Sequence, residues 1–307
     1  MLFSLLHAFL LFTCVVLLVR LTLPARYVLL NPYAAMLDNL LTRGLAKLQP
    51  AFPLPTKALC GLLLVLFLCA DAVMLSRLQL NLVNTGALAV FTLPSTTFVH
   101  WLWIAIYGLA RHLLMLLTAV LFFSVWHRTR QLPGYSGDLL RLSVCPVVRL
   151  PVFVQLVVLC VGATVLAASL FLTSTEVAYN FEQQVMRQDA LSGLFSYFSI
   201  STLQFPFQLL ALAIAMIFEL FSELFGFTLT LTFVALLSSF ARSQGLTHFI
   251  DDLFRLLRGP LPEVRLGVIN LTPLLLLAIF FLLSGITQML GLFLVNRLAT
   301  LVGGYVV

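Results

Sequence analysis

Long uninterrupted apolar runs dominate the chain and alternate with shorter segments that carry most of the charges. One membrane crossing takes about 20 apolar residues, and six runs come close to this length or exceed it: 2–23, 58–76, 99–126, 152–173, 207–241 and 272–301. The pattern therefore predicts an all-α polytopic membrane protein with about six transmembrane helices. The fifth run would be about 50 Å long as one helix, so we expect it to tilt, to kink near Gly226 or to project from the membrane.

The segments that follow the first, third and fifth runs resemble one another. Each carries an aspartate followed by apolar residues, at Asp38, Asp138 and Asp252, and each leads through prolines into the next run. A pattern that recurs about every hundred residues predicts three tandem hairpins built from one repeated unit. The predicted units are residues 1–77, a degenerate second unit at 78–173, and residues 174–307, which include an additional outer segment.

The same three segments show the spacing of amphipathic helices that lie at the membrane surface. In the first, polar Asp38, Asn39, Arg43 and Lys47 separate from an apolar set, Met36, Leu37, Leu40, Leu41, Leu45 and Leu48. In the third, Asp251 and Arg255 are four residues apart and can pair on a helix surface. Helical spacing in the outer connections also predicts interfacial helices there, with apolar positions Val177, Phe181, Val185, Leu191, Leu194, Phe195 and Phe198.

Charge is scarce and unevenly placed. Apolar residues make up 62% of the chain and charged residues 9%, whereas about 25% is usual in soluble proteins. Most of the 17 Lys and Arg residues fall in the first, third and fifth connections, so the positive-inside rule places both termini outside, in a bacterial inner membrane. No Lys or Arg precedes Arg20, which indicates a retained first span rather than a signal peptide. We read the excess positive charge as topology and expect no nucleic-acid partner.

Ionisable residues inside the apolar runs are the sharpest candidates for function, because an unpaired charge in hydrocarbon costs several kcal/mol. Arg111 and Glu219 each lie 12 residues into their runs, and Glu223 is one helical turn beyond Glu219. We expect Arg111 to pair with Glu219 or with Glu223 as a structural ion pair. The alternative is that the two carboxylates bind a cation or pass a proton. Asp71, near the outer end of the second run, is a weaker candidate.

Motifs for cofactors and catalysis are absent from the sequence. His7, His100 and His112 show no spacing that would place two imidazoles face to face on a haem, and the five cysteines lack paired spacing. The phosphate-binding, serine-hydrolase and zinc-protease motifs do not occur. We therefore expect no cofactor, no metal site and no catalytic residue, and the protein is not predicted to be an enzyme.

The first and third units contain several short motifs, which are Val15–Arg20, Asn31-Pro32-Tyr33, Leu48-Gln49-Pro50 with Pro53, then Leu236–Phe240, Arg258–Leu261 and Asn270–Pro273. Together they resemble the repeat of the YggT/YlmG family of integral membrane proteins. Family members commonly have two such units, whereas this chain has three. The resemblance implies fold-defining roles for the matched residues Arg20, Asn31, Pro32, Asn270, Thr272 and Pro273. On physical grounds, Arg20 can reach lipid phosphate or cap helix carbonyls, and Asn31-Pro32 can turn the chain into the first surface helix.

The resemblance implies a protein without established catalysis that organises partners at a membrane. We expect a non-catalytic scaffold or assembly factor, in contact with the lipid bilayer, that binds other integral membrane proteins or forms a homo-oligomer. The alternatives are a channel or transporter component in the response to osmotic stress, which would use Arg111, Glu219 and Glu223, and an accessory subunit of a larger membrane complex.

Overall fold

The membrane body of the protein is helical. The computed structural model describes residues 2–23, 25–50, 52–77, 82–84, 90–92, 97–129, 131–173, 176–179, 196–198, 205–238, 244–266 and 269–301. Within these residues, five helices are long and apolar enough to cross a membrane: α4 (Thr56–Arg77), α5 (Phe98–Trp126), α7 (Val152–Thr173), α8 (Phe205–Ser238) and α10 (Thr272–Leu301). The N-terminal helix α1 (Leu2–Thr22) contains a shorter apolar stretch. The chain is thus a multi-pass membrane protein.

Most helix boundaries lie within two or three residues of the apolar runs, because a helix in hydrocarbon must satisfy its own backbone until it reaches the polar interface. The longest helix, α8, has 34 residues and continues through Gly226 without interruption. Its length of about 51 Å exceeds the hydrocarbon thickness of about 30 Å. The excess is in line with the tilt or projection that the length of the apolar run predicts.

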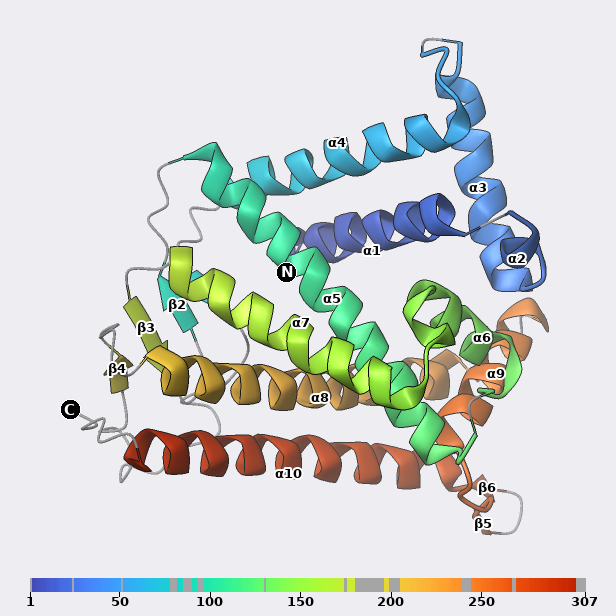
Figure 1. Ribbon diagram of the computed structural model, residues 1–307. Helices are drawn as coiled ribbons and strands as arrows, with labels where there is room; N and C mark the ends of the chain where they lie inside the picture. Colours follow the sequence, from blue (N-terminus) through green and yellow to red (C-terminus); the bar gives the residue numbers. More distant parts are fainter. Residues whose placement is uncertain are drawn as a thin grey trace.

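The long helices form neighbouring pairs whose members are joined by short helices at one end of the molecule (Figure 1). Helix α1 packs on α4, α5 contacts α7, and α8 packs extensively on α10. The short helices are α2 (Ala25–Leu29), α3 (Pro32–Leu48), α6 (Gly134–Ser143), the 3-10 turn η1 (Val147–Arg149) and α9 (Gln244–Arg258). We call α3, α6 and α9 the helix layer.

The opposite end carries a small antiparallel sheet in the order β1-β2-β3-β4. Its strands are β1 (Leu82–Asn84), β2 (Val90–Thr92), β3 (Glu176–Tyr179) and β4 (Ser196–Phe198), and a separate pair, β5 (Arg265–Leu266) and β6 (Ile269–Asn270), precedes α10. The predicted outer helices are therefore wrong at Val177 and Phe198, which lie in strands. Phe181, Val185, Leu191, Leu194 and Phe195 lie outside the described residues.

The reason for this difference is a pairing between distant segments of the chain. Strand β2 pairs with β3 so that Val90 lies opposite Ala178, which joins two connections separated by two long helices. Local spacing of apolar residues carries no information about such a partner, and strand formation depends on its neighbours more than helix formation does.

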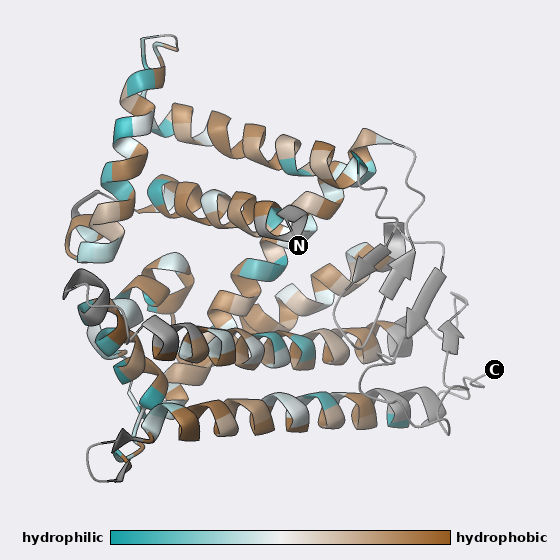
Figure 2. Ribbon diagram, turned by 180° about the vertical axis from the view of Figure 1, so that it is seen from behind, coloured by the Kyte–Doolittle hydropathy of each residue, from teal (hydrophilic) through white to brown (hydrophobic). Residues whose placement is uncertain are grey.

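Helix α8 lies at the centre of the core. Leu212, Met216 and Leu220 on α8 are almost completely buried, as is Phe280 on α10. The outward faces stay apolar: Phe281 and Met289 on α10 are 68% and 69% exposed. Figure 2 shows apolar colouring along the long helices and hydrophilic positions gathered on the helix layer. Apolar surface around the body and polar surface at its end are expected for a protein immersed in lipid.

Candidate functional site

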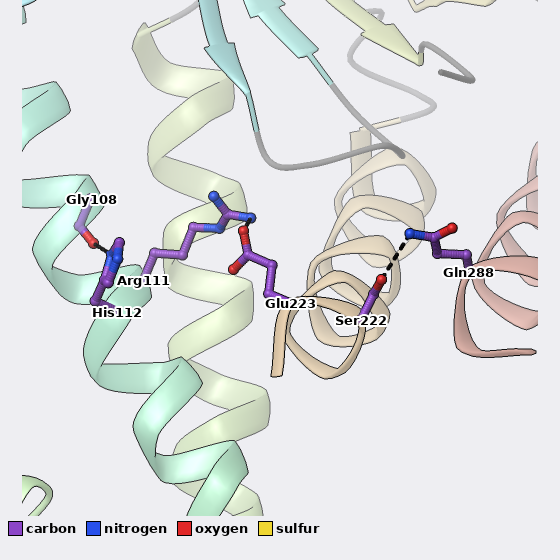
Figure 3. A network of polar contacts seen from close by, with 6 residues as sticks. All are labelled: Gly108, Arg111, His112, Ser222, Glu223 and Gln288. Carbon is purple, nitrogen blue, oxygen red and sulfur yellow. Dashed lines mark hydrogen bonds and ion pairs between the residues drawn. The ribbon is translucent and has the colours of Figure 1, made fainter. Parts of the chain in front are cut away.

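An ion pair joins α5 to α8 within the candidate membrane spans. The guanidinium of Arg111 donates through Nη2 to Oε1 of Glu223 (Figure 3). The two side chains are 14% and 35% exposed. Of the two partners that the sequence left open, the structure brings Glu223 to Arg111. Mutual pairing lowers the cost of placing two charges away from water.

Further polar side chains lie around this ion pair. Glu219, one turn before Glu223 on α8, is only 5% exposed. His112, next to Arg111, donates from Nδ1 to the carbonyl of Gly108 at 2.9 Å. Figure 3 shows His112 and Gly108 on α5, next to Arg111 and its partner Glu223 on α8.

Polar contacts also join α8 to α10. Gln288 on α10 donates from Nε2 to Oγ of Ser222 at 2.9 Å, and Ser222 lies 3.4 Å from the hydroxyl of Ser284. Such hydrogen bonds hold transmembrane helices together, because lipid offers no competing donors or acceptors. We call Arg111, Glu219, Ser222, Glu223 and Gln288 the embedded polar group.

The weakest charged candidate from the sequence has a defined partner. Asp71 is 1% exposed, and its Oδ1 lies 2.7 Å from Nδ1 of His7, so the contact joins α4 to α1. His100 contacts the hydroxyl of Thr97 at 2.5 Å, at the start of α5. Both histidines therefore make short polar contacts to nearby side chains. Among the described residues, no group of three or more His, Cys, Asp and Glu could hold a metal ion.

The second candidate site is in the helix layer and begins at Asn31. Its Oδ1 accepts hydrogen bonds from the amides of Tyr33 and Ala34 at 3.0 and 3.1 Å, and Pro32 occupies the first position of α3. An N-cap of this type satisfies amides that have no partner within the helix, and proline at this position loses nothing. Asn31 also donates from Nδ2 to the carbonyl of Tyr135 on α6, at 2.6 Å. The turn expected from the sequence thus also ties α3 to α6.

Asp252 ties α9 to the same place. Its Oδ2 accepts a hydrogen bond of 2.7 Å from the amide of Ser136, the third residue of α6, so a side chain of α9 caps the start of α6. Gly134 makes this approach possible: its φ is +73°, and an added Cβ would lie 1.9 Å from Oδ1 of Asp252. Any side chain at this position would displace the carboxylate or strain the backbone.

Tyr33 completes the contacts among the three helices. Its ring meets Tyr135 of α6 and Phe249 of α9 edge to face, with centroids 6.2 and 5.2 Å apart. Asp252 also lies near its hydroxyl: burial raises the pKa of Tyr33, and the negative charge of Asp252 raises this pKa further. We call Asn31, Tyr33, Tyr135, Ser136 and Asp252 the layer cluster.

Arg20 has a different partner from those expected. Its Nε lies 3.1 Å from Oδ1 of Asp38, so the end of α1 is joined to α3 by an ion pair. Asp38, which the helical spacing assigned to the polar face, is only 9% exposed. The reason is that α3 packs near the end of α1, so this part of its polar face meets protein rather than water.

The matched positions of the third unit lie at the start of α10. Oγ1 of Thr272 accepts a hydrogen bond of 3.0 Å from the amide of Val264, which fastens the preceding loop, and Pro273 is buried. Asn270 lies in β6. On α9, Asp251 and Arg255 are both exposed.

Sequence reasoning found Asn31 and Arg111 but not the roles of Tyr33, Tyr135 and Ser136. Tyr33 belongs to a different connection from Tyr135 and Ser136, and nothing in their spacing shows that they meet.

Comparison with known proteins gives no match for the chain among family models, curated proteins or solved structures.

Proposed function

We propose that the protein is a non-catalytic integral membrane scaffold, related to the YggT/YlmG family, that binds other membrane proteins through its helix layer. The observation that carries this proposal is the layer cluster. It joins α3, α6 and α9, which come from three distant segments of the chain, through side-chain and backbone hydrogen bonds. A surface held in one arrangement before binding loses less entropy when a partner docks.

The proposal includes a topology of six spans in three hairpins, in which α1 crosses the membrane in addition to the five candidate spans. Its support is the order of the elements: α3, α6 and α9 each separate two long apolar helices, and all three lie at one end of the molecule. Basic residues of the described chain gather at this end, among them Arg43, Lys47, Arg141, Arg149 and Arg255. By the positive-inside rule this end faces the cytoplasm of a bacterial inner membrane.

The outer surface of the helix layer has the composition of a docking site. Met36 and Leu40 on α3 are 65% and 56% exposed, next to exposed Arg43. On α9, exposed Asp251 and Arg255 lie opposite the buried apolar side formed by Leu253 and Leu257. Apolar anchors beside charges of both signs are typical of protein interfaces with an apolar core and a polar rim.

Native mass spectrometry of the protein, extracted in mild detergent from its own membranes, tests the proposal. We expect a partner chain at fixed stoichiometry in the unchanged protein. Asp252→Ala, which removes the hydrogen bond from α9 to the start of α6, should reduce this partner at least severalfold. Arg77→Ala is the control, because Arg77 is an exposed charged residue at the far end of α4, outside the helix layer. A protein that is always isolated alone, or only as a homo-oligomer, would contradict a scaffold for other proteins.

A second candidate, a channel or transporter component, is favoured by one observation. The ion pair of Arg111 and Glu223, with Glu219 one turn away, lies within the membrane spans. Ionisable groups at this depth often mark ion or proton pathways. Flux of ions through the protein in liposomes, abolished by Arg111→Leu with Glu219→Gln while the protein stays inserted and bound to its partner, would favour this function over the scaffold.

A further inference from the structure

An apolar groove runs along α5 between α1 and α7. Its floor is formed by Leu113 and Leu117 of α5, and its sides by Leu18 of α1 and by Val158 and Val165 of α7. The groove has a volume of about 410 Å³, and none of its lining residues is charged. A hollow of this composition in a transmembrane body is suited to a hydrocarbon chain.

The groove is comparable in length to one membrane leaflet. Its lining residues on α7 run from Val158 to Leu166, which is about 12 Å at 1.5 Å per residue. Val144, Cys145 and Val147, before the start of α7, line its shallow end. Half of a hydrocarbon core measures about 15 Å, so the groove can accommodate much of one acyl chain within a leaflet.

A second, polar pocket of about 260 Å³ adjoins the shallow end of the groove. Cys145 lines both cavities, so the polar pocket and the groove are neighbours. The polar pocket contains Arg141 of α6 and Arg149 of η1. The guanidinium of Arg149 lies 4.9 Å from the centre of the Tyr27 ring, and this cation–π contact holds it in place.

The charges of the polar pocket match one phosphodiester. Two guanidinium groups and the carboxylate of Asp138 leave a net charge of +1. Arginine presents paired N–H donors whose geometry fits phosphate oxygens. Basic pockets between transmembrane helices at the cytoplasmic side are characteristic sites for anionic lipid headgroups.

We propose that the groove and the polar pocket together bind one anionic glycerophospholipid. One acyl chain lies in the groove along α5, and the phosphodiester is held by Arg141 and Arg149. The single negative charge of phosphatidylglycerol balances the net charge of the pocket. Asn31 of the layer cluster also lines the polar pocket, but the phosphodiester is assigned to Arg141 and Arg149, which belong to neither the layer cluster nor the embedded polar group. Occupancy of the site does not depend on a protein partner.

Native mass spectrometry of the protein from nanodiscs made of equal parts phosphatidylglycerol and phosphatidylcholine tests this site. We expect one phosphatidylglycerol to remain bound under activation that strips all other lipids. Arg141→Gln together with Arg149→Gln should weaken retention about 30-fold, from about fivefold per arginine. The matched control is Arg43→Gln with Lys47→Gln, two exposed basic residues of α3 outside the pocket, which should leave retention unchanged.

A second pair of variants tests the groove separately from the headgroup. Val165→Trp fills the groove and should abolish retention of the lipid, although both arginines stay in place. Leu156→Trp adds the same bulk at an exposed position of α7 that does not line the groove, and should retain the lipid. Both variants should elute as the unchanged protein does in size-exclusion chromatography.

Three outcomes would overturn the proposal. The first is a lipid that survives the arginine and Val165→Trp substitutions, which would place it elsewhere. The second is equal retention of phosphatidylcholine, which would remove the recognition of charge. The third is loss of lipid in the two controls, since that would mean a general loss of structure. None of these results depends on whether the protein binds a partner chain, so the scaffold and the lipid site fail independently.

Discussion

The layer cluster and the embedded polar group both use polar side chains to join helices, but in different surroundings. In the layer cluster, Asp252 accepts from the amide of Ser136 at the end of the molecule, where water can replace a lost partner. In the embedded group, Arg111 meets Glu223 within the membrane spans, where the surroundings are apolar. A similar deletion should therefore destabilise the protein more in the second region.

The largest expected effect follows from breaking the embedded ion pair. Arg111→Leu leaves the carboxylate of Glu223 without this guanidinium among apolar helices. We expect a loss of about 3 kcal/mol in the free energy of unfolding. Equilibrium unfolding of the protein in mixed micelles, by titration with a denaturing detergent, measures this difference.

The double variant is the control for this prediction. Arg111→Leu with Glu223→Leu removes both charges, so most of the lost stability should return. If the single and double variants unfold alike, the destabilisation comes from lost packing and not from an uncompensated charge. That result would remove the distinction between the two regions.

The next largest loss of stability is expected from a change that conflicts with the backbone geometry of the helix layer. Gly134→Ala places a Cβ 1.9 Å from Oδ1 of Asp252 at a residue with φ of +73°. The left-handed backbone alone costs about 1–2 kcal/mol for alanine, and displacement of the carboxylate adds to it. We expect a loss of about 2 kcal/mol or more by the same unfolding titration.

Gly44 provides the matched position for this test. It lies within α3, and an added Cβ would meet nothing within 4 Å. Gly44→Ala should therefore stabilise the protein by about 0.5–1 kcal/mol, because alanine is the better helix former. Equal destabilisation at both glycines would show that the contact with Asp252 has no part in the effect.

Two neighbouring aspartates of α9 allow a carboxylate that accepts a hydrogen bond, Asp252, to be compared with an exposed one, Asp251. Asp252→Ala leaves the amide of Ser136 without its acceptor, which should destabilise the protein by about 1–2 kcal/mol. Asp251→Ala should stay within about 0.5 kcal/mol of the unchanged protein. Faster hydrogen exchange at the Ser136 amide should accompany the first substitution only, and exchange that is unchanged in both would refute the cap.

The spans could be read from the sequence because hydrocarbon allows few alternatives. The boundaries of α5 and α7 follow the apolar runs, since a helix in lipid is the simplest way to satisfy the backbone. The contact of Arg111 with Glu223 could not be read in this way. Two carboxylates lie on one face of α8, and how they meet α5 depends on the rotation and shift of two helices that are distant in sequence.

The layer cluster was predictable only in its local part. Asn31-Pro32 indicates a helix start by its own chemistry, and α3 begins there. The contact of Tyr33 with Asp252, more than two hundred residues away, depends on how three connections pack together. The same reason explains the sheet at the other end, where helical spacing at Val177 was overridden by pairing with β2.

The smallest expected effect concerns the hydroxyl of Tyr33. Tyr33→Phe removes the hydroxyl near Asp252 and keeps the ring contacts with Tyr135 and Phe249. At pH 8 we expect a loss of at most about 1 kcal/mol, since the polar interactions of a single hydroxyl contribute about that much. Unfolding titrations of the two proteins from pH 8 to pH 11 measure both this loss and its dependence on pH.

The pH dependence has a definite sign. The pKa of Tyr33 is raised in the folded protein above its ordinary value of 10.0, by burial first and then by Asp252. The unfolded chain therefore ionises first, so the stabilisation by the neutral hydroxyl is complete below about pH 10. It is lost as the pH rises through the raised value. The difference between the unchanged protein and Tyr33→Phe should be constant near pH 8 and shrink above pH 10. A difference that grows with pH would mean that the folded protein does not favour the neutral hydroxyl of Tyr33.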